Sequence, residues 1–358
     1  MRKNSRAAVA VPELTIGFDI SDRTVAYCEL NAAGEIVAEG TLKLTRVELW
    51  RYVSKKPAGT RIAMETGTHS HWIREEVEAA GHEAIVANAR ELAAVTGRSR
   101  RTDGQDARQL ARLARVDPAL LNPVELRRTL EQADLFVIRA RAVLVEARTM
   151  LINFARAAAK TMGHRLPASS AHCFVERLRE AIPDVLEPAL QPLVAVLEAL
   201  GEQLERYDEG IEELAEKQYP ETRWLKQVPG VGTLTALTYV LTIGDPARFA
   251  RSRDVGAFLG LVPRRRQSGQ QDPHMPITKC GDRYLRKLLT QCSHVILGGH
   301  GADGALRRWG LAHAQQSRTS KKRAVTAVAR KLAVLLHRLW SRQESYQPFP
   351  ASSIAAAA

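Results

Sequence analysis

Two runs of apolar residues with heptad spacing occupy the middle of the chain and limit its fold more than any other feature. The first run is spaced four-three throughout, and its members are Leu126, Leu130, Ala133, Val137, Ala140, Leu144, Ala147, Leu151 and Phe154. The second is spaced three-four throughout, and its members are Leu190, Leu193, Leu197, Leu200, Leu204, Tyr207, Ile211 and Leu214. Because this spacing keeps apolar side chains on one stripe of a helix, each run predicts a long helix of the coiled-coil type.

A segment rich in Pro and small residues separates the two runs, so they are expected to form a helical hairpin packed on itself or on another copy of the chain. The first helix carries arginines and the second carries a series of acidic residues, among them Arg141 and Asp208. These complementary flanks favour antiparallel or intersubunit pairing. An ordinary pair of bundle helices is the alternative.

The first third of the chain alternates strand and helix signals. Apolar runs bounded by turn residues predict strands at 14–20, 24–30, 35–42, 61–65 and 82–87. Helical signals fall at 45–56, 69–80 and 103–115. A meander followed by alternating β and α elements predicts an α/β domain with a mixed sheet.

The last third is basic and mainly helical. Trp224 to Gly232, followed by an apolar helix, resembles a helix-hairpin-helix, in which Gly230 and Gly232 would let backbone N–H groups approach a phosphate. A plain turn is the alternative. Residues 319–340 predict a basic amphipathic helix, and the residues after Gln343 are expected to be disordered.

The overall charge favours a polyanionic partner. The formal net charge is +13 and the isoelectric point is near 9.9, which is typical of nucleic-acid-binding proteins. The four cysteines form no Cys-x-x-Cys pair, so reduced thiols in a cytoplasmic protein are expected. No segment predicts a signal peptide or a membrane span.

Four acidic residues suggest a metal site. Asp19 and Glu65 each end a predicted strand, while Asp103 and Asp106 lie three residues apart at the start of a predicted helix. Two hard divalent cations need several carboxylate oxygens converging on one point, and this arrangement can supply them for phosphodiester cleavage. Gly17 leaves room beside the strand. The alternative for each residue alone is a solvated charge or a helix-terminal acid.

A serine among basic residues is the second candidate for chemistry. Ser268 follows Arg264, Arg265 and Arg266, whose guanidinium groups would neutralise phosphate oxygens during attack by the hydroxyl. The alternative is a loop serine beside phosphate-binding arginines. Two histidine pairs, His69 with His71 and His294 with His300, lack partners at metal-ligand spacing, so capping or core roles are expected for them.

The order of several short motifs resembles one known family. They are Gly17-Phe-Asp19, Ala63-Met-Glu-Thr-Gly67, Arg101-Thr-Asp-Gly-Gln-Asp-Ala107, Val228-Pro-Gly-Val-Gly232, Ala257-Phe-Leu-Gly-Leu-Val-Pro263, Gln267-Ser-Gly269, and Ile277-Thr-Lys-Cys-Gly281 with Leu285-Arg286. Together they resemble the DEDD transposases of insertion sequence family 110, to which the pilin-gene inverter is similar. The resemblance runs from about residue 14 to residue 340.

The resemblance implies a RuvC-like, ribonuclease H-fold N-terminal domain, a coiled-coil arm and a mainly helical C-terminal transposase domain. We place these at 1–120, 121–221 and 222–345, with a disordered tail at 346–358. Asp19, Glu65, Asp103 and Asp106 match the acidic tetrad of the family, and Ser268 matches its nucleophilic serine. The implied reaction is DNA strand exchange through a 5′-phosphoserine link, with two Mg²⁺ ions at the tetrad.

The resemblance also implies partners. Members of the family act as tetramers on donor and target DNA, guided by a structured noncoding bridge RNA, so a homodimer or homotetramer is expected for this chain. The expected nucleic-acid contacts are Arg101, Gly230, Gly232, Arg264, Arg265, Arg266, Lys279 and Arg283. The protein is expected in the bacterial cytoplasm, on the nucleoid when acting, with no membrane partner.

Two other functions fit the same residues. In a RuvC-like structure-selective nuclease, a metal-activated water would attack and Ser268 would only position phosphate. In a non-catalytic nucleic-acid scaffold, the four acids would be surface charges. Replacing Asp19 with Asn would leave a scaffold intact and disable a metal enzyme.

Overall fold

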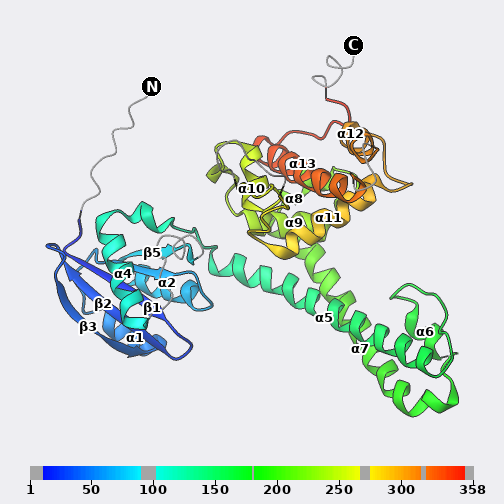
Figure 1. Ribbon diagram of the computed structural model, residues 1–358, viewed down its shortest axis with the longest axis horizontal. Helices are drawn as coiled ribbons and strands as arrows, with labels where there is room; N and C mark the ends of the chain where they lie inside the picture. The colour runs from blue at the N-terminus through cyan, green and yellow to red at the C-terminus, as the bar shows by residue number, and fades with distance from the viewer. Residues whose placement is uncertain (1–10, 90–101, 180, 267–274, 316–319, 351–358) are drawn as a thin grey trace. The chain divides into compact units, whose positions relative to one another are not determined.

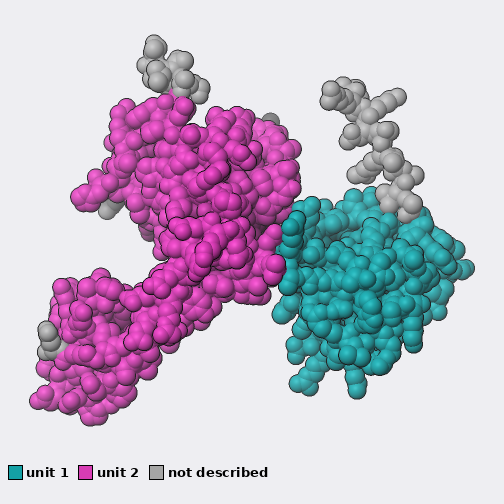
Figure 2. All heavy atoms as spheres, turned by 180° about the vertical axis from the view of Figure 1, so that it is seen from behind, with its two compact units in different colours: residues 1–129 teal, residues 130–358 magenta. Residues whose placement is uncertain are grey.

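The chain divides into two compact units, residues 1–129 and 130–358 (Figure 2). A computed structural model describes residues 11–89, 102–179, 181–266, 275–315 and 320–350. The helical arm belongs to the same compact unit as the C-terminal helices. The finer division at residues 120/121 and 221/222 stays a prediction.

A mixed five-stranded sheet forms the centre of unit 1. Its strands are β1 (Leu14–Ile20), β2 (Thr24–Asn31), β3 (Ile36–Lys43), β4 (Arg61–Glu65) and β5 (Glu83–Ala87). The strand order is β3-β2-β1-β4-β5. β1 to β3 pair antiparallel, whereas β4 lies parallel to β1 and β5 lies parallel to β4. The predicted mixed α/β sheet is therefore confirmed, and it is compatible with the ribonuclease H-type fold.

Helices cover both faces of this sheet. They are α1 (Arg46–Val53), α2 (Ser70–Ala79) and α4 (Asp103–Val116). Leu49 of α1 and Ile73 of α2 pack with Phe18 on one face. Leu110 of α4 packs with Ala63, which points to the opposite face. Because successive strand residues alternate between faces, β1 and β4 contribute to both cores.

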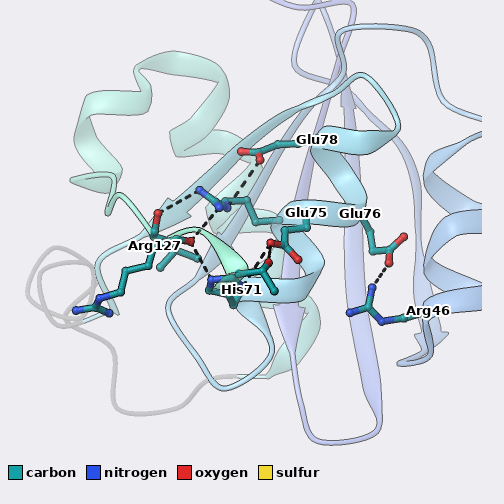
Figure 3. Close-up of polar contacts among 9 residues, drawn as sticks. Arg46, His71, Glu75, Glu76, Glu78 and Arg127 are labelled. Carbon is teal, nitrogen blue, oxygen red and sulfur yellow. Dashed lines mark hydrogen bonds and ion pairs between the residues drawn. The ribbon is translucent and has the colours of Figure 1, made fainter. Parts of the chain in front are cut away.

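Side chains of α2 hold the backbone at the end of unit 1 (Figure 3). The Nε2 atom of His71 lies 2.9 Å from the carbonyl oxygen of Arg127. Arg74 donates to the carbonyl oxygens of Leu126 and Arg127 at 3.4 and 3.3 Å, and its Nε lies 3.8 Å from Glu78. His71 thus binds a neighbouring segment rather than capping its own helix.

A helical hairpin forms the arm of unit 2 (Figure 1). It consists of α5 (Thr129–Thr161) and α7 (Glu187–Lys217), with the short helix α6 (Phe174–Arg179) between them. At its free end Ala155 and Phe174 pack with Leu190. At its other end Ile138 and Ile211 pack with Leu237 of the C-terminal helices. The long helical hairpin is confirmed, and its base is part of the C-terminal core.

The predicted seam is correct for α7 and wrong for α5. In α7, Leu190, Leu197, Leu204 and Ile211 are buried, and the alternate members of the run are half-buried. In α5, no member of the predicted run is buried. The buried side chains of α5 lie off that run, and they are Leu135, Ile138, Ala142, Ile152, Ala155 and Ala159. Helix α5 has apolar residues on several faces, so heptad spacing can be traced along more than one line.

Charge pairing across the hairpin is partly as expected. Arg141 of α5 makes two hydrogen bonds to Asp208 of α7, at 2.5 and 2.9 Å. Arg139 instead pairs with Asp282, at the start of the C-terminal helix α11 (Arg283–Leu297). The arginines of α5 therefore bind both the second arm helix and the C-terminal helices.

The remaining helices pack around a buried core. They are α8 (Thr222–Lys226), α9 (Thr233–Ile243), α10 (Val255–Phe258), α12 (Ala305–Ala314) and α13 (Ser320–Arg342). Tyr239 of α9 is fully buried, and its hydroxyl donates to the Ala333 carbonyl oxygen at 2.7 Å. The amphipathic α13 is confirmed, with Val328, Leu332 and Leu339 buried. None of the helices in the described ranges has the length and apolar character needed to cross a bilayer.

The segment after α13 differs from the expected disordered tail. The backbone N–H of Tyr346 donates to Gln227 at 2.8 Å, and that of Ala305 donates to the Pro348 carbonyl oxygen at 2.8 Å. Tyr346 also packs against the C-terminal core. These contacts place residues up to Pro350 along α12, because an aromatic side chain and two hydrogen bonds hold them there. The four cysteines are free thiols, as expected.

Replacing Ile138 with Ala tests which face of α5 holds the arm. Ile138 is fully buried, so we expect the substitution to lower the free energy of unfolding by about 2–5 kcal/mol. Leu130 belongs to the run predicted from sequence and is 77% exposed, so Leu130→Ala should change it by less than about 0.5 kcal/mol. Denaturant unfolding of the full chain measures both. Equal losses would contradict this assignment of the buried face.

Candidate active site

The ends of two adjacent parallel strands place Asp19 beside Glu65. Strand β1 pairs with β4 in a register that sets Gly17 opposite Ala63 and Phe18 opposite Met64. Asp19 and Glu65 are the next residues of the two strands, and both are half-buried. Because equivalent residues of neighbouring strands point to the same face, the two carboxylates emerge together at the carboxyl edge of the sheet.

The face of β1 that carries Asp19 is covered by α4 at backbone contact distance. A Cβ atom added to Gly17 would lie 2.0 Å from the carbonyl oxygen of Ala107 and 2.6 Å from the backbone nitrogen of Ala111. Ala107 and Ala111 are themselves fully buried. Glycine at this position therefore allows an approach that any other residue would prevent, and the expected room beside the strand is filled by the helix backbone.

The first turn of α4 carries the other two acids. Asp103 opens the helix and Asp106 follows one turn later, after the N-cap residue Thr102. Residues three apart share a helix face, and this face continues into Ala107 and Leu110, which pack on the sheet. Negative charge in a first turn is favourable because the unpaired N–H groups of the helix point there.

The pKa of Asp19 depends on the other three carboxylates. Burial raises the pKa of Asp19, and repulsion from Asp103, Asp106 and Glu65 raises it further, to about 6. A backbone hydrogen bond to Ile20 acts in the opposite direction. The four acids predicted from sequence are thus brought together, with Asp19 at the centre.

These four carboxylates, all within the described ranges, repel one another but are not arranged as a set of metal ligands. Among the residues whose placement is described, no three His, Cys, Asp or Glu side chains are arranged to hold a metal. Coulomb repulsion acts over many ångströms, whereas Mg²⁺ and Ca²⁺ require oxygens at about 2.0–2.6 Å. Oxygen-only donors and mutual repulsion fit a hard divalent cation, and binding would draw the carboxylates closer together.

A pocket of about 330 Å³ opens beside Asp19 and Glu65, and His69 lines it. The Nδ1 atom of His69 accepts a hydrogen bond from the Trp72 indole at 3.2 Å. A neutral His69 ring therefore carries its proton on Nε2, which lies 3.8 Å from Asp22. Of the two expected roles, capping and core, His69 takes the N-cap position of α2, although its side chain makes no cap hydrogen bond. The sequence signal for a pocket position of His69 was its spacing of four residues from Glu65.

The predicted serine lies outside the described residues, but both flanks of its segment are placed. Pro263 and Ile277 form an antiparallel bridge. Arg264 N–H donates to the Pro276 carbonyl oxygen and Thr278 N–H donates to that of Val262, both at 2.9 Å. Arg264, Arg265 and Arg266 are exposed on one flank. Ser268 and Arg101 remain sequence predictions.

Two glycines bring the flanking motifs into backbone contact. A Cβ atom on Gly260 would lie 2.3 Å from the backbone of Cys280, and one on Gly281 would lie 2.2 Å from the carbonyl oxygen of Phe258. Both glycines have positive φ, +66° and +72°. Arg286 donates to three carbonyl oxygens at this crossing, those of Leu259, Cys280 and Gly281. Arg286 was not predicted as a site residue, and it positions the segments that flank Ser268.

The remaining predicted basic contacts lie nearby. Lys279 and Arg283 are exposed, and Lys279 adopts a left-handed backbone with φ of 56°. Arg283 opens α11 after the N-cap Asp282, whose carboxylate accepts from the backbone N–H of Leu285. Both cations thus face solvent beside the Gly260–Gly281 crossing, where a phosphate backbone could reach them.

An acidic residue of α7 lies beside the glycine turn before α9. Gly230 has φ of +89°, and Gly232 is the exposed N-cap residue of α9. Thr233, the first residue of α9, donates to the Glu212 carboxylate at 2.7 Å, and Lys226 lies 3.5 Å from the same carboxylate. Two helices joined by a glycine turn are present, which both a helix-hairpin-helix and a plain turn would give, and Glu212 lies beside the helix N-terminus where a phosphate was predicted.

The raised pKa of Asp19 predicts that the acidic site lowers the stability of the folded protein near neutral pH. The folded-state pKa of about 6 lies above the ordinary value of 3.8 for Asp, so stabilisation by protonated Asp19 is present at low pH and is lost as pH rises through about 6. Asp19→Asn should therefore raise the free energy of unfolding near neutral pH. After allowance for solvent screening we expect on the order of 1 kcal/mol.

Thermal unfolding in chelator, followed from about pH 4.5 to pH 7.5, measures this effect. The melting temperatures of wild type and Asp19→Asn should diverge as pH rises. Asp22→Asn is the matched control, because Asp22 lines the same pocket on an exposed turn. A constant difference between the melting temperatures of wild type and Asp19→Asn across this pH range would contradict the electrostatic coupling of Asp19 to the other acids.

Known proteins match both units of the chain. A family model of IS110-type DEDD transposases, described as Transposase, matches residues 16–162, and one described as Transposase IS116/IS110/IS902 family matches residues 222–304. The transposase for insertion sequence element IS1111A of Coxiella burnetii is 28% identical over 339 residues, which cover 93% of this chain and 91% of that protein. The transposase for insertion sequence element IS1328 of Yersinia enterocolitica is 27% identical over 333 residues, covering 90% and 96% respectively.

These matches follow the order of the described elements. The first spans the sheet, the four acids and α5, and the second spans the glycine turn, the Gly260–Gly281 crossing and α11. The chain therefore belongs to the IS110 family of transposases, and it is an enzyme of DNA transposition.

Proposed function

We propose that the protein catalyses RNA-guided DNA cleavage and strand exchange, with a metal-binding acidic tetrad and a serine nucleophile. The observation that supports the proposal is the position of Asp19 and Glu65 at the ends of adjacent parallel strands, with Asp103 and Asp106 in the first turn of the helix that covers β1. The three other acids raise the pKa of Asp19, which agrees with this arrangement. Membership of the DEDD transposases suggests use of a divalent metal and implies DNA substrates. Two Mg²⁺ ions are our assignment.

The four carboxylates would hold the metal, and their protonation sets when they can do so. Mg²⁺ bound there would neutralise charge developing on the scissile phosphate. Asp19 must lose its proton to act as a ligand, and its pKa of about 6 leaves it ionised at neutral pH. His69, which presents Nε2 to the same pocket, can exchange a proton with a group bound there.

Ser268 would supply the nucleophile for strand exchange. Its Oγ would form a bond to phosphorus as the P–O3′ bond breaks, while the hydroxyl proton leaves Oγ and the 3′ oxygen gains a proton. A 5′-phosphoserine and a free 3′ hydroxyl result. The exposed arginines 264–266 and the nearby Lys279 and Arg283 support binding of the phosphate backbone.

The partners follow from the same proposal. Donor and target DNA would be the substrates, and a structured noncoding bridge RNA would pair with both. The net charge of +13 suits two nucleic-acid partners, because each lysine or arginine that contacts phosphate releases counterions from it. The DNA sequence would then be recognised by base pairing with the RNA rather than by side chains of the protein.

A structure-selective nuclease is the second candidate. The acids and the pocket beside them all belong to unit 1, so hydrolysis by a metal-activated water would need no residue of unit 2. In that reaction Ser268 would only position phosphate. The two chemistries differ in whether protein becomes linked to DNA.

We also propose that the arm pairs with another copy of the chain. A heptad line on α5 that shares Ala140, Ala147 and Phe154 with the predicted run is largely exposed in the single chain. Its large members are Phe136, Val143, Met150 and Phe154, each between 55% and 65% exposed. Ala140 and Ala147 complete its four-three spacing. Large apolar side chains at these positions of a helix are typical of a coiled-coil seam.

The covalent intermediate gives the first test of the proposal. With Mg²⁺, the flanking RNA, and DNA carrying an element junction and a target, wild type should form a detergent-stable protein–DNA adduct. Ser268→Ala should abolish the adduct, and Asp19→Asn should reduce its formation by about 100-fold or more. Denaturing electrophoresis measures this. Cleavage without an adduct, unchanged in Ser268→Ala, would support the nuclease instead.

The exposed seam gives a second test. Replacing Phe136 and Met150 with Glu should dissociate the oligomer, since charge at two seam positions cannot be buried without a large cost. Val196→Glu is the control, because Val196 is an exposed residue of α7 outside the seam. Sedimentation measures the mass of each variant. A monomeric wild type that cleaves at full rate would overturn this part of the proposal.

A further inference from the structure

A large pocket lies among the C-terminal helices, and most of its lining residues fall outside both matched regions of the family. Its volume is about 1230 Å³, and its walls come mostly from α12, α13 and the segment that follows α13. The second family match ends at residue 304, before α12 begins. The volume exceeds the range of about 300–1,000 Å³ that is usual for small-ligand sites, so the pocket has room for more than a single small molecule.

The charged residues around this pocket are cations. Those described in its lining are Lys322, Arg323, Arg330, Lys331 and Arg338, all from one side of α13, and no Asp or Glu is among the described lining residues. Arg338 pairs with Glu344 at 3.1 Å. For the other four, no carboxylate partner is found within the described ranges. An anionic ligand is the complement of such a rim.

An aromatic pair forms part of the wall. The rings of Trp309 and His313 lie nearly parallel, with 5° between their planes and 5.4 Å between their centroids, and both line the pocket. The Lys331 ammonium lies 3.8 Å from the centre of the Trp309 ring. Burial lowers the pKa of Lys331. The ring face of Trp309 therefore holds a partly desolvated ammonium where a ligand ring could stack.

Close packing fixes the position of this aromatic pair. A Cβ atom on Gly310, the residue after Trp309, would lie 2.6 Å from Val328 and 2.7 Å from Leu297. Helix α12 therefore packs tightly against α13 and α11 at this glycine, which keeps the backbone of Trp309 beside the rim cations of α13. The tethered segment around Tyr346 and Pro348 forms another wall.

We propose that this pocket binds an unpaired nucleotide of a single nucleic-acid strand. A base would stack on the Trp309–His313 pair, and Lys331 would move from the ring face to a phosphate that Lys322 and Arg323 also contact. A duplex keeps its base faces stacked and cannot use the aromatic wall, whereas an unpaired strand offers bases and phosphates together. The inference deepens the proposed function, since it names a form of nucleic acid that the enzyme would hold.

Binding of matched oligonucleotides tests the proposal in chelator, where no cleavage can occur. The probes are a short oligothymidylate, its oligouridylate counterpart and an abasic strand of equal length and charge. Wild type should bind at least one base-containing strand on the order of 10-fold more tightly than the abasic strand. Trp309→Ala should remove this preference, and Trp309→Phe should retain part of it. Trp50→Ala, at an exposed tryptophan of α1, should leave it unchanged.

A second pair of variants separates the cations from the aromatic wall. Lys331→Ala should weaken the binding of all three strands. It should also reduce the magnitude of the slope of log affinity against log salt by about 1. Lys321→Ala, on the same helix but outside the lining, should have a smaller effect. Photocrosslinking of a 5-iodouracil strand should label a peptide from α12. Preference for DNA or for RNA identifies the source of the nucleotide.

The outcomes that overturn the inference are specific. Equal binding of base-containing and abasic strands by wild type would do so, as would a base preference that survives Trp309→Ala in a protein whose melting temperature is unchanged. Crosslinks confined to other helices would also contradict it. Failure of adduct formation with Ser268 intact would count against the proposed chemistry alone, because this binding assay needs neither metal nor catalysis.

Discussion

The contact between α4 and β1 at Gly17 is the constraint on which the acidic site depends. The helix backbone occupies the space that a Cβ atom would need, with the Ala107 carbonyl oxygen 2.0 Å from that position. Small residues at 107 and 111 allow the same approach from the helix side. Because Asp19 lies two residues after Gly17 on the same face, and Asp103 lies one turn before Ala107, this single contact sets the separation of the acids. A larger side chain at residue 17 would move the helix and its two carboxylates together.

The acids gathered by this contact carry a cost that the rest of unit 1 must offset. The raised pKa of Asp19 means that the folded chain resists ionising it, so the site is least stable under the neutral conditions in which it would bind metal. Sites that concentrate charge for function commonly lower stability in this way. A divalent cation would relieve the repulsion, and the enzyme would then be more stable when loaded.

The sequence allowed prediction of elements whose signals are local. The strands and helices of unit 1 follow from alternation and turn residues, and the four acids could be grouped because each lies at the end of an element. The buried face of α5 could not be predicted, since Leu130, Ile138 and Phe136 each belong to a plausible apolar line and only tertiary packing chooses Ile138. The roles of Arg286 and His69 also escaped prediction. Arg286 binds three backbone carbonyl oxygens, and backbone acceptors leave no trace in a sequence.

Close backbone contact through glycine also occurs in unit 2, where it positions the segments around the predicted serine rather than the acids. Gly260 and Gly281 bring two motif segments together on either side of the predicted serine, and Arg286 holds their carbonyl oxygens. Gly310, beside Trp309, differs in kind, because a Cβ atom there would meet the side chains of Val328 and Leu297 rather than backbone. At the Gly260–Gly281 crossing a missing side chain lets two backbones fix the direction of neighbouring residues, whereas at Gly310 it lets apolar side chains of α13 and α11 pack on α12. The glycines of the family motifs are thus explained by packing near a site. The packing at Gly310, which lies beyond the matched regions, holds α12 beside the cations of α13 that line the pocket.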